Sequence, residues 1–394
     1  MDPTQALTMV GGISVALVVA VAILISASRQ KTQATSADDR TLEALCERHP
    51  GLQLTLGSMV QPATVKGTVG KAQVSLSFTT EADPISGNRR SVVELAVSAP
   101  GSLSDGIVVP RGRRTTATLP GGRRLRTTDE AFDEAYVARS ANPATMLSHL
   151  DADARAALVK AQHSGWGLEF GRWSCRMSDL PDVAQLDERL QQGLAVLAHT
   201  HREGTVAEAL ERMAHDDPQP GVRAVALQKR LTTGRAAPAT LRQLASRDEP
   251  VAVVAARALR SDGLADLERL SRLPATTREA LLALAELDDL PPATRQDCEE
   301  RLVALLARDE GRLQVIDALG LVALPTAVPA LAPFAEGGFL GSRQKAQAQD
   351  AIRRIQARAV GAEAGQVSIV APAETGKLSV AAAREAGRMS QTEH

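Results

Sequence analysis

Two neighbouring stretches decide the fold of this chain: LGLVALPTAVPALAPFAEGG at residues 319–338, and SRQKAQAQDAIRRI at residues 342–355. The first contains a proline-led helical pattern with Val328, Leu331 and Ala332, and it ends in a glycine-containing turn. The second starts with basic residues and then repeats Ala and Ile at helical spacing. Spacings of three and four give each helix one apolar face, and a lone helix pair cannot bury both faces. We therefore expect this pair to stack on similar neighbours.

The same pattern recurs upstream with a period of about 30 residues, as internal repeats do. Each turn marker separates two short helical patterns, and the markers fall at 215–218, 247–250, 273–276 and 308–311. Five helix pairs over 203–358 follow from this spacing. The arrangement resembles the HEAT-repeat family, including the short HEAT-like units of phycobilin lyases, and 319–355 is the nearest match. The resemblance implies an α-solenoid whose extended surface binds other proteins.

Aromatic residues mark a domain boundary near residue 202. The chain has five Phe, two Trp and one Tyr, and all except Phe334 and Phe339 lie between positions 78 and 173. After Trp173 the apolar residues are almost all Ala, Leu and Val, which suit closely packed helices. We therefore expect a separate domain over 41–202.

This domain carries both strand and helix signals. A short helix is predicted over 41–48, and residues 52–110 alternate apolar and polar positions between turns, which is typical of a small antiparallel sheet. Residues 128–162 switch to helical spacing, and 165–175 alternate Trp166, Leu168 and Phe170 like one strand. An amphipathic helix is predicted from Asp182 to about His201.

An uncharged apolar run extends from Leu7 to Ile25. At roughly 1.5 Å per residue it matches the hydrocarbon thickness of a bilayer, so it predicts an uncleaved single-pass transmembrane helix. Arg29 and Lys31 follow the run and no basic residue precedes it. By the positive-inside rule, this predicts a protein of the inner (plasma) membrane whose later domains lie on the cytoplasmic side. A cleaved signal peptide is the alternative, although it requires a positive n-region and a shorter core.

The predicted fold class is therefore α+β, with an N-terminal transmembrane helix, a small antiparallel-sheet α+β domain and a C-terminal α-solenoid of HEAT-like repeats. The predicted segments are an anchor at 1–28, a linker at 29–40, the α+β domain at 41–202, the solenoid at 203–358, and a disordered tail at 359–394. The tail is rich in Ala, Gly, Glu, Ser and Thr and has little apolar periodicity.

The segment from Thr127 to Ala161 resembles a stretch that recurs in bacterial membrane-anchored proteins of unknown function. In that family a Thr-Gly-Asp-x-x-Phe-Asp motif precedes an apolar strand and a helix that begins near a Leu-x-x-x-x-Arg pattern. Here the motif is occupied by Thr127, Asp129, Phe132 and Asp133, with Thr128 in the place of the glycine. The resemblance covers about a quarter of the chain and names no activity.

Six arginines fall within 16 residues that contain no acid: Arg111, Arg113, Arg114, Arg123, Arg124 and Arg126. Glycines and Pro120 make this stretch a loop or hairpin. It predicts contact with anionic headgroups or with an acidic protein, and the alternative is a solvated hairpin. No aromatic residue is interleaved, which argues against single-stranded nucleic acid.

Other candidate sites are weaker than their structural alternatives. His199 and His201 are two positions apart on a helix and face different ways, and Cys46 with His49 lacks a third member. Trp166, Phe170 and Trp173 either line a pocket or fill the core, and core filling is favoured. We find no phosphate-binding loop and no nucleophile elbow, so no catalytic residue, cofactor or metal is predicted.

Two functions remain as hypotheses. Lys plus Arg (45) nearly balances Asp plus Glu (46), so no global charge attracts nucleic acid. The first hypothesis is a membrane-anchored scaffold that binds unknown protein partners through the solenoid. The alternative is a HEAT-like lyase or ligand-binding protein related to phycobilin lyases, although no histidine lies between 216 and 393.

Overall fold

The computed structural model describes the following residues: 38–57, 62–82, 89–100, 103, 106–113, 119, 121–201, 204–308, 312–336 and 342–362. Its contacts divide the chain into two compact units, Met1–Val222 and Arg223–His394. The helix predicted at 41–48 is confirmed, because residues 38–48 are helical and both Leu42 and Leu45 are fully buried.

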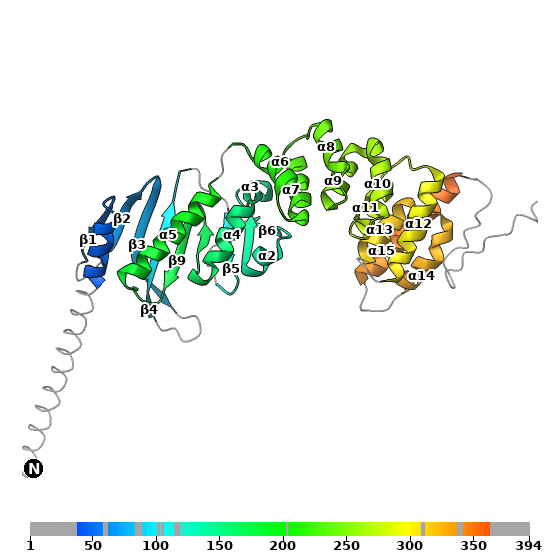
Figure 1. Ribbon diagram of the computed structural model, residues 1–394. Helices are drawn as coiled ribbons and strands as arrows, with labels where there is room; N and C mark the ends of the chain where they lie inside the picture. The colour runs from blue at the N-terminus through cyan, green and yellow to red at the C-terminus, as the bar shows by residue number, and fades with distance from the viewer. Residues whose placement is uncertain are drawn as a thin grey trace, which may run out of the picture. The chain divides into compact units, whose positions relative to one another are not determined.

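The first unit is built on one antiparallel sheet (Figure 1). In the described residues it has nine strands in the order β1-β2-β3-β4-β9-β8-β5-β7-β6. The strands in chain order are β1 (Leu52–Thr55), β2 (Thr64–Val69), β3 (Ala72–Ala82), β4 (Arg89–Ser98), β5 (Gly106–Pro110), β6 (Arg123–Leu125), β7 (Tyr136–Ser140), β8 (Gly167–Glu169) and β9 (Arg172–Met177).

A single row of directly opposed residues crosses all nine strands on one face. The row is Leu52, Gly67, Val74, Val97, Trp173, Leu168, Val108, Ala138 and Leu125. Every side chain in it except the glycine is buried, so this row forms the sheet side of the core. Because side chains alternate across a strand, the next row faces the other side and carries charged residues, including Arg124, Arg139 and Glu169.

The prediction of a small sheet was wrong, because three strands were misread. Residues 165–175 are not one strand but the hairpin β8–β9, which turns at Phe170 and Gly171. Both residues have positive φ (51° and 83°), as a two-residue type I′ turn requires. Phe170 therefore lies at the turn and is 49% exposed, whereas Trp166 and Trp173 fill the core. Strand β7 lies inside the stretch predicted to be helical.

The helices of this unit after residue 48 are α2 (Glu130–Ala135), α3 (Pro143–Ser148), α4 (Ala152–Ala161), α5 (Val183–Thr200) and α6 (Val206–Asp216). Helices α2, α3 and α5 contact the sheet, whereas α4 packs against α2 and α5, and α6 packs against α3. The helix predicted from Asp182 is confirmed as α5, with Asp182 as its N-cap. Gly193 on α5 leaves room for the Trp166 ring, since a Cβ there would lie 2.3 Å from that ring. The indole N–H of Trp173 donates to Thr200 Oγ1 at 3.1 Å, which fixes the end of α5 to the sheet.

The described residues of the second unit form helices joined by short connections, with no strand. Its helices are α7 (Pro220–Thr233), which begins just before the boundary, α8 (Pro238–Ala245), α9 (Pro250–Leu259), α10 (Leu264–Ser271), α11 (Thr277–Ala285), α12 (Pro292–Ala307), α13 (Arg312–Val322), α14 (Val328–Glu336) and α15 (Ser342–Ala362). Consecutive helices pack as pairs, and α9, α11 and α13 also contact one another in turn. The small core residues Ala255, Ala256 and Ala283 let these helices approach closely.

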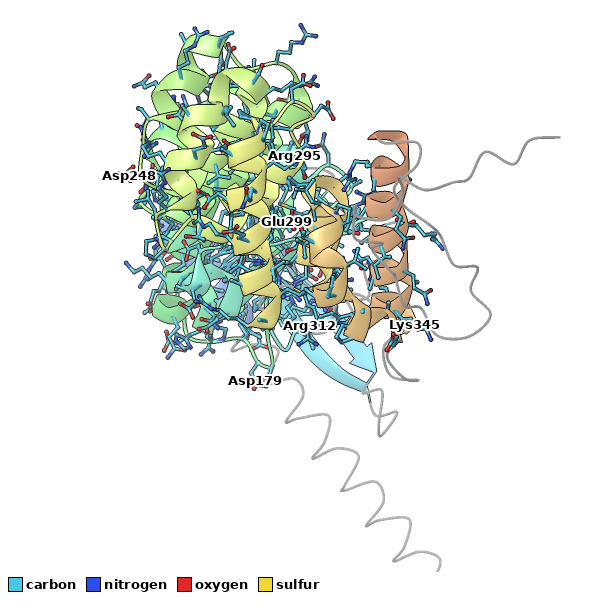
Figure 2. The ribbon with its side chains drawn as sticks, turned by 90° about the vertical axis from the view of Figure 1, so that its right-hand side faces the viewer. Asp179, Asp248, Arg295, Glu299, Arg312 and Lys345 are labelled. Carbon is cyan, nitrogen blue, oxygen red and sulfur yellow. The ribbon has the colours of Figure 1, made fainter. Side chains whose placement is uncertain are left out.

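Polar side chains fix the junctions between these helices. Glu299 on α12 (labelled in Figure 2) is nearly buried and accepts hydrogen bonds from the Leu324 N–H at 2.9 Å and from Thr326 Oγ1 at 2.7 Å. Arg358 on α15 donates to the carbonyls of Gly320 and Ala323, at the C-terminal end of α13. Desolvation by burial lowers the pKa of Arg358, with further lowering by two neighbouring arginines. These bonds hold α15 as a helix to Ala362, inside the stretch 359–394 that was predicted to be a disordered tail.

The single-pass membrane architecture, and the inner-membrane location that rested on it, are corrected. Among the described residues no helix has the length and apolar character needed to cross a bilayer. The helices there are amphipathic and carry charged residues on their open faces, as α6 does with Glu211 and Arg212. The predicted anchor at Leu7 to Ile25 lies outside the described residues, as do residues 29–37 of the predicted linker at 29–40. The last three residues of that linker, 38–40, are helical instead.

Removal of the Glu299 carboxylate should destabilise the second unit. In Glu299→Ala the Leu324 N–H and the Thr326 hydroxyl lose their acceptor, and hydrogen bonds to charged groups are worth about 1.5–3 kcal/mol each. We expect a loss of about 3–6 kcal/mol in the free energy of unfolding of this unit, measured by urea denaturation followed by circular dichroism. Glu300→Ala changes the exposed neighbour and is the matched control, so an equal loss in both variants would contradict this role.

Candidate functional site

A groove of about 620 Å³ runs across four helices of the second unit: α7, α9, α11 and α13. Helices α9, α11 and α13 are each the second helix of a consecutive pair, and with α7 they bring side chains from four parts of the sequence onto one continuous surface. Apolar residues dominate the lining and include Leu231, Val253, Val254, Leu282 and Leu321. Leu321 is 45% exposed, which makes it one of the most accessible large apolar side chains in the described chain.

The rim of this groove is more acidic than basic. Glu279, Glu286 and Asp317 line it together with one cation, Arg257, so three carboxylates and one guanidinium leave a local charge of −2. Arg257 forms an ion pair with Glu286 at 2.5 Å. Arg278 approaches Glu279 to 3.7 Å from outside the lining. The groove therefore offers an apolar strip flanked by carboxylates.

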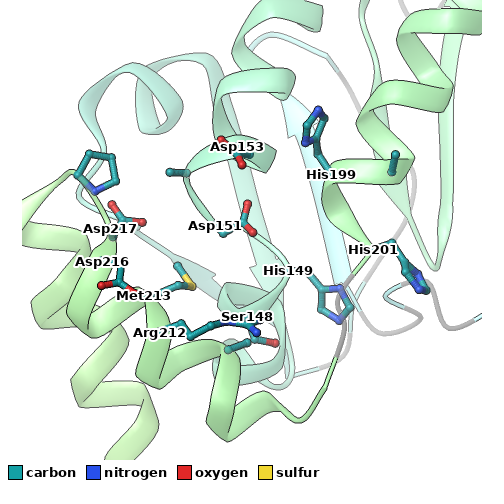
Figure 3. Close-up of a pocket in the computed structure, with 14 residues that line it drawn as sticks. Ser148, His149, Asp151, Asp153, His199, His201, Arg212, Met213, Asp216 and Asp217 are labelled. Carbon is teal, nitrogen blue, oxygen red and sulfur yellow. The ribbon is translucent and has the colours of Figure 1, made fainter. Parts of the chain in front are cut away.

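A second, polar pocket of about 470 Å³ lies in the first unit, between the α3–α4 junction, the end of α5 and α6 (Figure 3). Its lining brings together histidines and acids that are distant in the sequence: His149, His199, His201, Asp151, Asp153, Asp216 and Asp217. Sequence reasoning considered His199 and His201 only as neighbours on one helix and missed His149. Neither these residues nor any others that the structure describes form a group of three or more His, Cys, Asp or Glu side chains placed so that they could hold a metal ion.

Several polar groups of this pocket have structural partners. His149 Nδ1 lies 2.9 Å from the Thr200 carbonyl oxygen. Asp151 caps α4 by accepting from the Ala154 N–H. Asp217 is held by Arg155, whose Nη1 and Nη2 lie 3.0 and 2.9 Å from its two carboxylate oxygens. Capping and pairing within the fold thus account for three members of the cluster, His149, Asp151 and Asp217.

Arg155 is the centre of a buried ion cluster. Its Nε donates to Asp129 at 2.8 Å and its Nη1 to the Leu150 carbonyl at 2.8 Å, in addition to the pair with Asp217. The side chains of Arg155 and Asp217 are each only 1% exposed. Desolvation by burial lowers the pKa of Arg155, but the hydrogen bonds to Asp217 and Asp129 outweigh it, so the pKa is raised overall. The guanidinium is therefore charged at any physiological pH.

This cluster unites the two motifs noted in the sequence. Asp129 belongs to the Thr-x-Asp-x-x-Phe-Asp stretch, and Leu150 and Arg155 form the Leu-x-x-x-x-Arg pattern. Asp133, the last motif residue, accepts from the backbone N–H groups of Thr127 and Thr128. The two motifs thus have a structural explanation as a cap, a turn and an ion pair.

Thr128 shows why the related pattern has glycine at this position. Its φ is +68°, in the left-handed region that glycine adopts freely and β-branched residues avoid. A Cβ added to Gly221 would lie 2.6 Å from Thr128 Oγ1, so this turn is also crowded. Thr128, which replaces the glycine of the motif, therefore has a strained backbone conformation.

The structure separates the six predicted arginines into different roles. Arg111 donates from Nε and Nη2 to the Asp133 carbonyl, and Arg113 donates to the carbonyls of Gly165 and Ser174. Burial lowers the pKa of Arg113, and Arg176 lowers it further. The remaining described members, Arg123, Arg124 and Arg126, are exposed on or beside β6. Arg114 lies outside the described residues.

The three thiols are free and are poor nucleophiles at neutral pH. Burial raises the pKa of Cys46, raises that of Cys175 to about 11, and raises that of Cys298 to about 12. His49 pairs with Asp187 at 2.8 Å, and this hydrogen bond is the main cause that lowers the Asp187 pKa. The spacing of Cys46 and His49 therefore reflects a helix end that is tied to α5.

No family model, curated protein or solved structure matches this chain. The resemblances to HEAT-like repeats and to the bacterial family of unknown function therefore stay predictions.

The buried cluster should be critical for the first unit. In Arg155→Met the carboxylates of Asp217 and Asp129 lose their cation, and loss of one partner of a buried pair typically destabilises by about 3–5 kcal/mol. We expect a loss of that size in urea denaturation followed by tryptophan fluorescence, because both tryptophans lie in this unit. The double variant Arg155→Met/Asp217→Leu should recover part of the loss. A single variant as stable as the surface control Arg172→Met would contradict the role of the cluster.

Relief of the strain at Thr128 should stabilise the same unit. Glycine removes a left-handed penalty of about 1–2 kcal/mol and adds an unfolded-state entropy cost of about 0.5–1 kcal/mol. We therefore expect Thr128→Gly to gain about 0.5–1 kcal/mol in the same denaturation experiment. Thr128→Ala keeps the Cβ and should show no gain, so equal stability of the two variants would exclude backbone strain as the cause.

Proposed function

We propose that this protein is a protein-binding scaffold, and that the groove of its second unit binds an amphipathic helical segment of another protein. The observation that carries the proposal is the apolar strip across α7, α9, α11 and α13, with Leu321 exposed at its α13 end. Binding in such grooves buries apolar side chains that recur at i, i+3, i+4 and i+7 on the partner helix.

The charges of the rim indicate which helix fits. The surplus of carboxylates favours a segment with Lys or Arg beside its apolar face, since opposite charges increase both specificity and the rate of encounter. An acidic helix would place like charges against Glu279 and Asp317. The expected partner segment is therefore basic as well as amphipathic.

The alternative of a lyase or pigment-binding protein finds less support. The residues that line the groove include neither histidine nor an aromatic side chain to stack on a planar ligand. In the polar pocket of Figure 3, Asp151 is used as a helix cap and Asp217 as the partner of Arg155. No observation favours a second function.

A phage-displayed library of short amphipathic helical peptides, selected on the full chain, tests the proposal. We expect enriched peptides to carry apolar residues at helical spacing and an excess of Lys and Arg. Leu321→Lys should lower the affinity of a synthetic enriched peptide about tenfold or more, because burial of one leucine is worth about 1.5–3 kcal/mol.

Leu324→Lys is the matched control for this substitution. Leu324 is 44% exposed, nearly the same as Leu321, but it is not among the residues that line the groove. The same charge is therefore added outside the groove, and affinity should stay unchanged. Enriched peptides that bind wild type and Leu321→Lys equally would refute the proposed function.

A further inference from the structure

The edge of the nine-stranded sheet carries four exposed arginines, which we call the edge arginines: Arg123, Arg124, Arg126 and Arg139. Arg139 lies on β7 and was not among the residues singled out from the sequence. The antiparallel register places it directly opposite Arg124 on β6. Directly opposed residues have Cβ atoms only about 5 Å apart, so the two guanidinium groups share one small area of the surface.

None of the edge arginines forms an ion pair with a described acid. In the same row across the sheet, the nearest acid is Glu169, which lies two strands beyond Arg139. Strands are spaced about 4.8 Å apart, so the Cα atoms of Arg139 and Glu169 are about 10 Å apart. Like charges placed directly opposite one another destabilise a sheet, and a bound anion removes that repulsion.

The backbone at this edge adds a second, independent feature. Strand β6 is last in the strand order, and no described strand pairs with its outer side. A terminal strand presents unpaired N–H and C=O groups to which an extended peptide can add. Arg124 opposes Arg139 directly and so points to the same face, and Arg126 follows the last residue of β6.

We infer that this edge binds an acidic, extended segment of a partner protein, which adds as a further strand beside β6. Carboxylates at alternate positions of that segment face Arg124, Arg126 and Arg139, where guanidinium groups hold carboxylates bidentately. Single-stranded nucleic acid fits less well, because no aromatic side chain is interleaved with the arginines for bases to stack on. This surface lies in the first unit and does not depend on the groove proposed above.

The test uses the full chain and a fluorescent peptide that alternates Glu with Val, with binding followed by fluorescence anisotropy. We expect saturable binding that weakens as salt rises, because the contacts are ionic. The variant Arg124→Gln/Arg139→Gln should bind about tenfold or more weakly, and Arg124→Gln alone should lie between it and wild type. Arg242→Gln, a matched exposed arginine in the second unit, should bind like wild type.

Strand addition is tested by the peptide itself. N-methylation of alternate Val residues removes backbone donors but keeps every carboxylate, and it should weaken binding about tenfold or more. Equal binding by wild type and the double variant would overturn the inference, as would equal binding of the methylated peptide or tighter binding of an oligothymidylate. Leu321→Lys should leave peptide binding unchanged, so failure here is distinguishable from failure of the groove.

Discussion

The first unit depends on one buried cation. Arg155 reaches from α4 to the N-cap of α2 through Asp129, and to the segment after α6 through Asp217. Because a buried charge without its partners is strongly unfavourable, these three segments must fold together. This constraint explains why α6 belongs to the first unit, with the division at Val222, although composition suggested a boundary near 202.

The helices could be predicted from the sequence because the patterns that indicate them are local. Val206, Leu210 and Met213 place an apolar face on α6 with no knowledge of distant residues. The sheet was harder, since β9 lies between β4 and β8, and no local pattern shows that Trp173 opposes Val97. The turn at Phe170 lacked the usual Asn-Gly signal, so two strands were read as one.

The candidate sites likewise depend on long-range contacts that local sequence patterns do not show. A run of arginines predicts a charged surface, but it does not show which guanidinium groups the fold itself uses. The Arg113 side chain donates to the carbonyls of Gly165 and Ser174 within the fold, whereas the Arg124 side chain is exposed. Arg139 entered the patch only through the pairing of β6 with β7. The residues that line the groove come from four helices. The sequence does not show that they share one surface, because this depends on how the helices pack.

A formal net charge of −1 conceals two local surfaces of opposite sign. The edge arginines are basic and the rim of the groove carries a surplus of carboxylates. Screening limits each field to about 10 Å at moderate salt, so a partner senses the patch it approaches and not the sum over the chain. The balanced composition therefore excludes a global attraction to one class of partner, but it is compatible with two separate partners, one acidic and one basic.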